Sequence, residues 1–94
     1  MFILNLTYIK TIEEVDKFVA EHIKYLEKYY EENKFICSGR KNPRTGGIIV
    51  CNANSINEVE SIIKEDPFYS EKVAKYDIIE FQPTKYEPDF KSFI

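Results

Sequence analysis

The longest regular pattern of apolar and polar positions runs from Thr11 to Lys34. Its apolar residues recur every three or four positions, the spacing that places side chains on one side of an α-helix. Thr11 and Glu14 form a capping box, in which each side chain accepts a backbone N–H of the first turn, and such a cap is worth ~1 kcal/mol. The pattern therefore predicts a helix over this whole stretch. Its apolar face consists of Ile12, Val15, Phe18, Val19, Leu26 and Tyr29, and His22 lies on the same side.

A second helix is predicted to begin at Ser55, which forms another capping box with Glu58. Apolar residues follow at helical spacing until about Glu65. Asp66-Pro67 ends this helix, because the residue before a proline is pushed out of the α region. Residues 68–70 then lead through a polar turn or a short helix toward the last strand. The apolar positions of the second helix are Ile56, Val59, Ile62 and Ile63.

Four shorter stretches have the β-branched, aromatic or apolar content that is typical of strands. The first alternates between two faces, and the second is a short run that Gly39 ends. The third opens after Gly47 and is apolar on both sides, which favours a central strand that is covered on both faces. The strands are expected at Phe2 to Ile9, Phe35 to Ser38, Ile48 to Cys51 and Tyr76 to Gln82.

The order strand, helix, strand, strand, helix, strand predicts an α+β fold, the ferredoxin-like split βαβ arrangement (βαββαβ). In this fold both helices cover one face of a four-stranded antiparallel sheet, and the other face is left bare. An identical sheet would cover it, so a homodimer is expected. We expect one domain over residues 1–94, since 94 residues suit a single core. Residues 84–94 form a tail whose aromatic content indicates packing on a partner subunit; its apolar residues are Tyr86, Phe90, Phe93 and Ile94.

Charge and composition exclude several classes of protein. A net charge of −3 and a pI of about 5.2 weigh against nucleic-acid binding, which requires a basic surface, and against binding to anionic membranes. No apolar run approaches the ~20 residues that span a bilayer, and the first ten residues lack the features of a signal peptide, so a cytoplasmic location is expected. Two cysteines and one histidine do not provide a zinc site.

The two middle strands are expected to pair as a hairpin. Pairing Gly39 with Gly47 sets Cys37 opposite Ile49, and Cys51 opposite Phe35. The cysteines would then be diagonal neighbours, ~7–8 Å apart and beyond the reach of a disulfide. We therefore expect both thiols to be free.

His22 is the natural candidate for acid–base chemistry, because it is the only group in the chain with an unperturbed pKa near neutrality, ~6.5. The alternative is a core histidine without a chemical task. Asp66 is the best candidate partner, since a carboxylate fixes the tautomer of an imidazole. On local sequence alone, Asp66 is more readily explained as the residue that ends a helix before Pro67. Geometry adds a difficulty: in one continuous helix His22 would lie ~16 Å along the axis from Thr11, away from the sheet end where Asp66 is expected.

The segment from Ser38 to Gly47 joins the two middle strands and carries three positive charges. Together with Gly39, its residues Arg40 and Arg44 provide donors for a carboxylate or phosphate. It is not a P-loop, because it leads into a strand and lacks the GK[ST] ending. The alternative is a solvated hairpin loop whose charges aid solubility.

These pieces together resemble the YCII-related (YciI-like) family. The resemblance is carried by EHIKYLEKYYEENKFICSG, then NPRTGGIIV, then DPFYSEKVAKYDIIEFQPTKY, and it covers nearly the whole chain. It implies a dimeric α+β barrel and an active site of one histidine and one aspartate, which match His22 and Asp66. Members of the family usually read SGP where this chain has Ser38-Gly39-Arg40, so the rim of the pocket is expected to differ.

The resemblance implies activities that move a proton at an activated carbon, such as dehydrochlorination of a hydroxylated chloroaromatic. Our first hypothesis is a small enzyme that uses neither a metal nor another cofactor. In it His22 transfers a proton, Asp66 orients His22, and the Ser38–Arg40 segment or Arg44 binds an anionic oxygen of a small organic ligand. Tyr8 and Phe68 would line the cavity. The alternative is a non-catalytic homodimeric module that binds a small metabolite or a protein. An RNA-binding sheet is disfavoured because no RNP-like signature is present.

Overall fold

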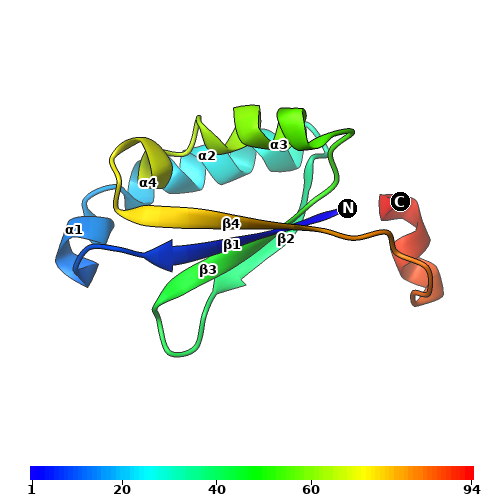
Figure 1. Ribbon diagram of the computed structural model, residues 1–94, viewed down its shortest axis with the longest axis horizontal. Helices are drawn as coiled ribbons and strands as arrows, with labels where there is room; N and C mark the ends of the chain where they lie inside the picture. The colour runs from blue at the N-terminus through cyan, green and yellow to red at the C-terminus, as the bar shows by residue number, and fades with distance from the viewer.

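One antiparallel sheet of four strands carries the helices on one of its faces (Figure 1). The computed structural model describes residues 1–94. None of its helices has the length and apolar character needed to cross a membrane. In chain order the elements are β1 (Phe2–Tyr8), α1 (Ile12–Asp16), α2 (Val19–Glu31), β2 (Phe35–Arg40), β3 (Gly46–Cys51), α3 (Ile56–Ile63), α4 (Pro67–Ser70), β4 (Ala74–Glu80) and the 3₁₀ helix η1 (Pro88–Phe93).

The strands lie in the order β2-β3-β1-β4, and every neighbouring pair is antiparallel. This order and the placement of α2 and α3 over one face confirm the predicted ferredoxin-like α+β fold. The third predicted strand, β3, is central as expected, because β1 and β2 flank it.

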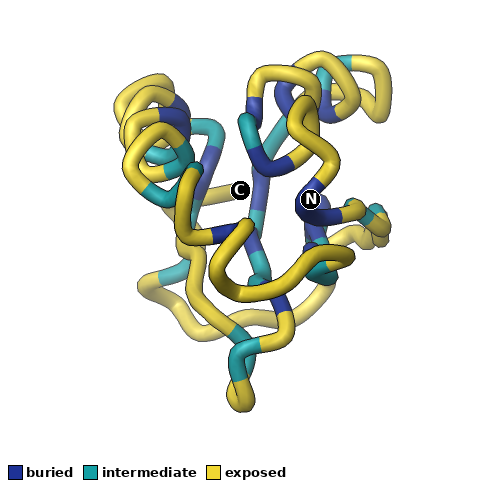
Figure 2. Tube along the Cα trace, turned by 90° about the vertical axis from the view of Figure 1, so that its left-hand side faces the viewer, coloured by how far each residue is buried: buried dark blue, intermediate teal, exposed yellow.

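The core lies between the sheet and the helix layer. On β1, Phe2, Leu4 and Leu6 are at most 2% exposed, while the alternate residues face away from the helices. Figure 2 shows buried chain on the strands and on the inner sides of the helices, whereas the loops are mostly exposed. The remaining apolar members of the core are Val15, Tyr25, Tyr29, Phe35, Ile49, Cys51, Val59, Ile62, Ile63, Phe68, Val73 and Ala74.

The predicted continuous helix from Thr11 to Lys34 is wrong, because the chain breaks into α1 and α2. Thr11 caps α1 as expected, its hydroxyl accepting the Glu14 N–H at 3.3 Å. Phe18 then leaves the helical conformation, with φ −113° and ψ 4°, and α2 begins at Val19. No glycine or proline marks this break. It separates α1, beside the end of the sheet, from α2, which lies over the sheet (Figure 1).

The predicted hairpin register is correct at one pair and wrong beyond it. Phe35 faces Cys51 as expected, but a β-bulge between Phe35 and Cys37 shifts the later pairs by one residue. Cys37 thus pairs with Val50, and Gly39 with Ile48. A shift of one residue moves each side chain to the opposite face of a sheet. Both thiols are free, with Cys37 exposed and Cys51 buried.

Several boundaries also differ from the prediction. β2 continues through Gly39 to Arg40, and β3 begins at Gly46 rather than after Gly47. β4 begins at Ala74, two residues before the predicted start. The second helix ends at Ile63, and α4 follows as the short helix that was one of the two predicted alternatives.

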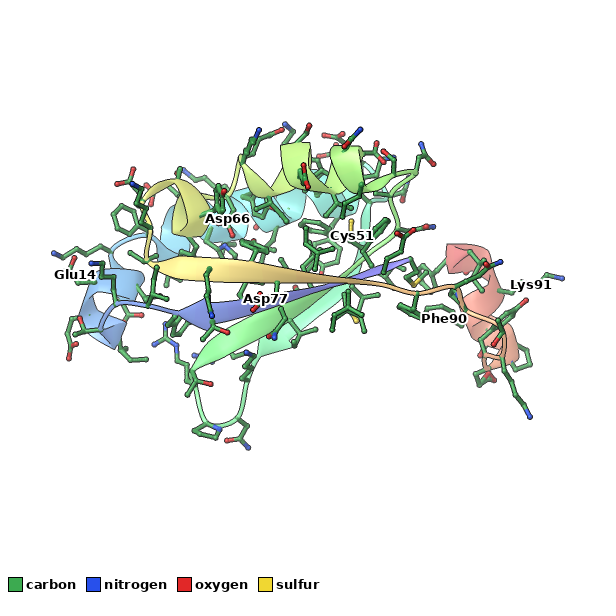
Figure 3. The ribbon with its side chains drawn as sticks, in the orientation of Figure 1. Glu14, Cys51, Asp66, Asp77, Phe90 and Lys91 are labelled. Carbon is green, nitrogen blue, oxygen red and sulfur yellow. The ribbon has the colours of Figure 1, made fainter.

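The second face of the sheet and the tail are not covered by other parts of the chain. Ile79 on that face is 52% exposed. The tail leads away from the sheet to η1, and Figure 3 shows Phe90 and Lys91 at this far end. The Asn52 side chain reaches it, donating to the carbonyl of Phe93 at 2.6 Å.

Candidate active site

The break between α1 and α2 places His22 in the first turn of α2. Its backbone N–H bonds to the carbonyl of Phe18 at 2.9 Å. The imidazole is stacked on the Phe68 ring, with centroids 4.0 Å apart and planes inclined by 3°. Its side chain is 14% exposed. His22 is therefore not carried away from Asp66 along one continuous helix that starts at Thr11. Instead, α2 begins as a separate helix beside the end of α3.

Asp66 connects α3 to α4 and is fully buried. It caps the short helix α4, since its Oδ1 accepts the N–H of Phe68 at 2.9 Å. Figure 3 shows Asp66 between the helix layer and the sheet, whereas Asp77 lies on the other side of β4. Both sequence interpretations of Asp66 thus describe the same residue: it organises the chain before Pro67, and it reaches His22.

The two predicted site residues meet within one subunit. His22 Nδ1 lies 2.8 Å from Asp66 Oδ1, and the Tyr76 hydroxyl donates to Asp66 Oδ2. A carboxylate only accepts hydrogen bonds, so pairing it with a neutral His22 assigns the imidazole proton to Nδ1. Nε2 is then left with a free lone pair. This is the tautomer that a histidine needs to take a proton at Nε2.

Next to His22 is a cavity of about 430 Å³, large enough for a small organic ligand. It lies between α2 and the sheet end that carries the β2–β3 loop. Apolar side chains form most of its walls, and arginines and backbone groups of β2 and β3 supply the polar part. Its lining residues are Leu6, Tyr8, Val19, His22, Ile23, Leu26, Ser38, Gly39, Arg40, Arg44, Gly46, Gly47, Ile48, Ile49 and Phe68.

All the predicted ligand-binding residues line this cavity. The bulge in β2 is responsible for part of this arrangement. Ser38 faces Ile49 and Arg40 faces Gly47, and both partners belong to the helix-covered side of the sheet. In the register expected from the sequence, Ser38 and Arg40 would have pointed to the bare side.

The polar groups of the lining differ in how free they are. The Ser38 hydroxyl is engaged by the Tyr30 hydroxyl at 2.6 Å, and Arg40 is exposed. Arg44 is anchored, because its guanidinium donates to Asp16 Oδ1 at 2.6 Å and lies over the Tyr8 ring at 5.7 Å. Its Nε is buried and has no hydrogen-bond partner in the protein. Arg44 lines the cavity while this nitrogen is closed off from solvent, so it presents an anchored positive charge to a ligand rather than a free Nε donor.

Gly46 brings β3 unusually close to β1 at the cavity wall. A Cβ at this position would lie 1.9 Å from the carbonyl oxygen of Leu6. That contact involves backbone on both sides and cannot be relieved by a rotamer change. The wall beside Tyr8 and Arg44 therefore requires glycine here.

Sequence reasoning missed two tyrosines beside Asp66. Tyr76 was recognised only as the start of a strand, and Tyr25 was left out of the predicted apolar helix face. Burial, followed by the nearby charge of Asp66, raises the pKa of Tyr25. Burial is also the first cause that raises the pKa of Tyr76 well above its ordinary value. Both hydroxyls therefore stay protonated, and no local pattern in the sequence indicated that they meet Asp66.

The same side chains offer little to a metal. No three His, Cys, Asp or Glu side chains are grouped as metal ligands would be. The polar residues of the lining supply an imidazole, guanidinium groups, hydroxyls and backbone amides.

Comparison with known proteins supports the fold and gives the family. No curated protein sequence matches the chain. The solved structure of 5-chloro-2-hydroxyhydroquinone dehydrochlorinase from Burkholderia phenoliruptrix, in complex with 2,5-dihydroxybenzoquinone, has a TM-score of 0.72 and 20% sequence identity. The match covers 87% of this chain and 94% of that chain, and it supports the fold of the dimeric α+β barrel proteins. The family profile of the YCII-related domain matches residues 1–82, so the chain, as the sequence resemblance predicted, belongs to the YCII-related domain family.

Proposed function

We propose that this protein is a small acid–base enzyme that moves a proton on a small organic substrate. The observation that carries this proposal is the hydrogen bond of 2.8 Å between His22 Nδ1 and the buried Asp66, which leaves Nε2 available beside the cavity. A histidine that is oriented by a carboxylate is a common general base.

In the proposed step, Nε2 takes a proton from a carbon or hydroxyl group of the substrate. The electron pair left on the substrate is delocalised onto an oxygen, which becomes an enolate or phenolate. Asp66 stabilises the imidazolium that forms, since its carboxylate oxygen lies 2.8 Å from Nδ1. Nε2 then returns the proton to another atom of the substrate or to a leaving group, which restores the neutral histidine. Acid–base chemistry of this kind uses only groups that the chain itself supplies.

The anionic oxygen has a partner in Arg44. Arg44 lines the cavity, and its link to Asp16 and Tyr8 holds the guanidinium in place. A positioned cation stabilises charge that develops during the reaction more than a mobile one does. Arg40, which is exposed, would add to the positive potential at the mouth of the cavity.

We propose a hydroxylated aromatic or lactone-like compound as the substrate class. A flat ring fits the mostly apolar walls beside Phe68, and ionisable oxygens suit Arg44. The structural neighbour, named as a dehydrochlorinase of a chlorinated hydroxyhydroquinone, supports this choice. The fold resemblance alone does not carry a substrate from one protein to the other.

We also propose that the protein works as a homodimer. The bare face of the sheet carries apolar side chains of β1, β3 and β4, and no other part of the chain covers it. A second copy of the sheet would bury both faces at once. Ile3, Val50 and Ile79 are among the side chains on this face.

The test uses 5-chloro-2-hydroxyhydroquinone as substrate and 2,5-dihydroxybenzoquinone as a binding probe. Chloride release that falls by at least about 100-fold in His22→Gln, with the affinity for the probe changed less than about threefold, supports an acid–base enzyme. Tyr69→Phe, a change at an exposed position outside the cavity, is the matched control.

A different outcome would favour the alternative. If the probe binds, no candidate ring or lactone is turned over, and His22→Gln weakens binding, the cavity belongs to a non-catalytic binding module. Failure of both binding and turnover with each compound would remove the proposed substrate class.

A further inference from the structure

Asp66 is held by more than its partner in the proposed acid–base pair. Oδ1 accepts from the Phe68 N–H at 2.9 Å and from His22 Nδ1 at 2.8 Å, while Oδ2 accepts only from the Tyr76 hydroxyl. A carboxylate turns about its Cβ–Cγ bond. The bond from Tyr76 holds the second oxygen, so hydrogen bonds on both oxygens oppose this rotation.

Tyr76 reaches Asp66 from a different element than His22 does. It lies on β4 opposite Leu6, on the helix-covered face of the sheet. Asp66 is thus clamped between α2, α4 and β4. A side chain fixed from three elements keeps its orientation even where each element moves slightly.

The surroundings make Tyr76 a permanent donor. Burial is the largest cause that raises the pKa of its hydroxyl well above the ordinary value, and the neighbouring Tyr25 and Asp66 act in the same direction. Tyr25 is buried beside it, and the Tyr25 hydroxyl makes no hydrogen bond with standard geometry. Neither hydroxyl gives up its proton in the pH range where a histidine works.

We infer that Tyr76 is a positioning residue, which holds Asp66 so that His22 keeps its proton on Nδ1 and presents Nε2 to the cavity. The inference rests on the proposed function for its catalytic meaning. The position of the proton on the His22 imidazole can be measured in the protein without substrate.

The chain offers an unusually direct test, because His22 is its only histidine and every imidazole signal belongs to it. Nuclear magnetic resonance of protein with isotope-labelled histidine distinguishes the two neutral tautomers. Near the upper end of the neutral range, the unaltered protein should show the Nδ1–H form alone. In Tyr76→Phe we expect a mixture in which the Nε2–H form, favoured by an imidazole in water, is readily detected.

Tyr69→Phe is the matched control. Tyr69 packs against Tyr76 with ring centroids 6.2 Å apart, but it is 43% exposed and its hydroxyl makes no bond to Asp66. This variant should keep the single Nδ1–H tautomer. An unchanged tautomer in folded Tyr76→Phe would overturn the inference, as would a mixture in the unaltered protein.

A second measurement keeps the inference testable if Tyr76→Phe does not fold. In the unaltered protein, the hydroxyl proton of Tyr76 should exchange slowly and give a resolved signal, because it is buried against a carboxylate. Rapid exchange of this proton with water would contradict the proposed clamp.

Turnover separates this inference from the proposed function. If chloride is released from 5-chloro-2-hydroxyhydroquinone, Tyr76→Phe should lower kcat roughly tenfold with KM unchanged. A tautomer that depends on Tyr76 in a protein without turnover would refute the enzyme but support the clamp. Turnover in a protein whose His22 tautomer does not depend on Tyr76 would support the enzyme and refute the clamp.

Discussion

Replacing Asp66 by Ala tests the site through stability, without knowledge of the substrate. Asp66 is fully buried, and its carboxylate serves three donors: the Phe68 N–H, His22 Nδ1 and the Tyr76 hydroxyl. Alanine removes the acceptor for all three. We therefore expect a large loss in the free energy of unfolding.

The magnitude follows from the separate bonds. Loss of the cap on α4 costs ~1 kcal/mol. A buried donor that is left without a partner costs ~1–3 kcal/mol, which applies most fully to Tyr76. His22 is 14% exposed and can regain part of its loss from water. Removing a buried charge returns its desolvation cost, so the net loss is about 3–5 kcal/mol.

Asp66→Asn should be much milder, with a loss of roughly 1–2 kcal/mol. The amide oxygen of asparagine, in the place of Oδ1, can still accept from the Phe68 N–H and from His22 Nδ1, and its NH₂ group can donate to the oxygen of Tyr76. Only the hydroxyl proton of Tyr76 then lacks an acceptor. Glu60→Ala is the control for loss of a negative charge, because Glu60 is an exposed residue of α3.

Urea unfolding followed by circular dichroism gives the three free energies at neutral pH. The expected order of loss is Asp66→Ala, then Asp66→Asn, then Glu60→Ala close to zero. A loss below about 1 kcal/mol for Asp66→Ala would refute the reasoning, since removing a buried carboxylate that is hydrogen-bonded on both oxygens leaves buried donors without partners. Equal losses for Ala and Asn would show that the individual bonds do not matter.

Three further outcomes are expected. Gly46→Ala should lose at least about 2 kcal/mol in the same urea assay, because its Cβ would lie 1.9 Å from the carbonyl oxygen of Leu6, whereas Gly39→Ala, with open space around the Cβ, should lose less than half as much. Burial raises the pKa of Cys51 to about 11, and of Tyr29 to about 12, so the folded state holds these protons more tightly than the unfolded state. These two groups should therefore leave the stability unchanged below pH ~8.5, and the stability should fall as pH rises toward 12; a rise in stability over that range would contradict the burial of these groups. Val50→Lys, on the bare sheet face, should give a monomer by light scattering, and an unchanged mass of a dimer would place the interface elsewhere.

Local chemistry determined where β1, β2 and the capped helices α1 and α3 begin. Thr11 and Ser55 cap the helices that their sequences predicted, because a cap bonds to backbone groups only three residues away. Alternation along β1 places Phe2, Leu4 and Leu6 on one face, and the structure shows that this face is the buried one. The order of the elements was enough for the ferredoxin-like fold.

Only the tertiary structure decided how the candidate site is assembled. The break at Phe18 and the bulge after Phe35 have no glycine or proline to mark them, yet the first brings His22 to Asp66 and the second turns Ser38 and Arg40 toward the cavity. The clamp of Tyr76 on Asp66 joins residues of two different elements. Each feature depends on how helix and sheet pack against one another. The short-range patterns of a sequence record which face is apolar, but not where a helix axis must bend or which buried donor will find a given carboxylate.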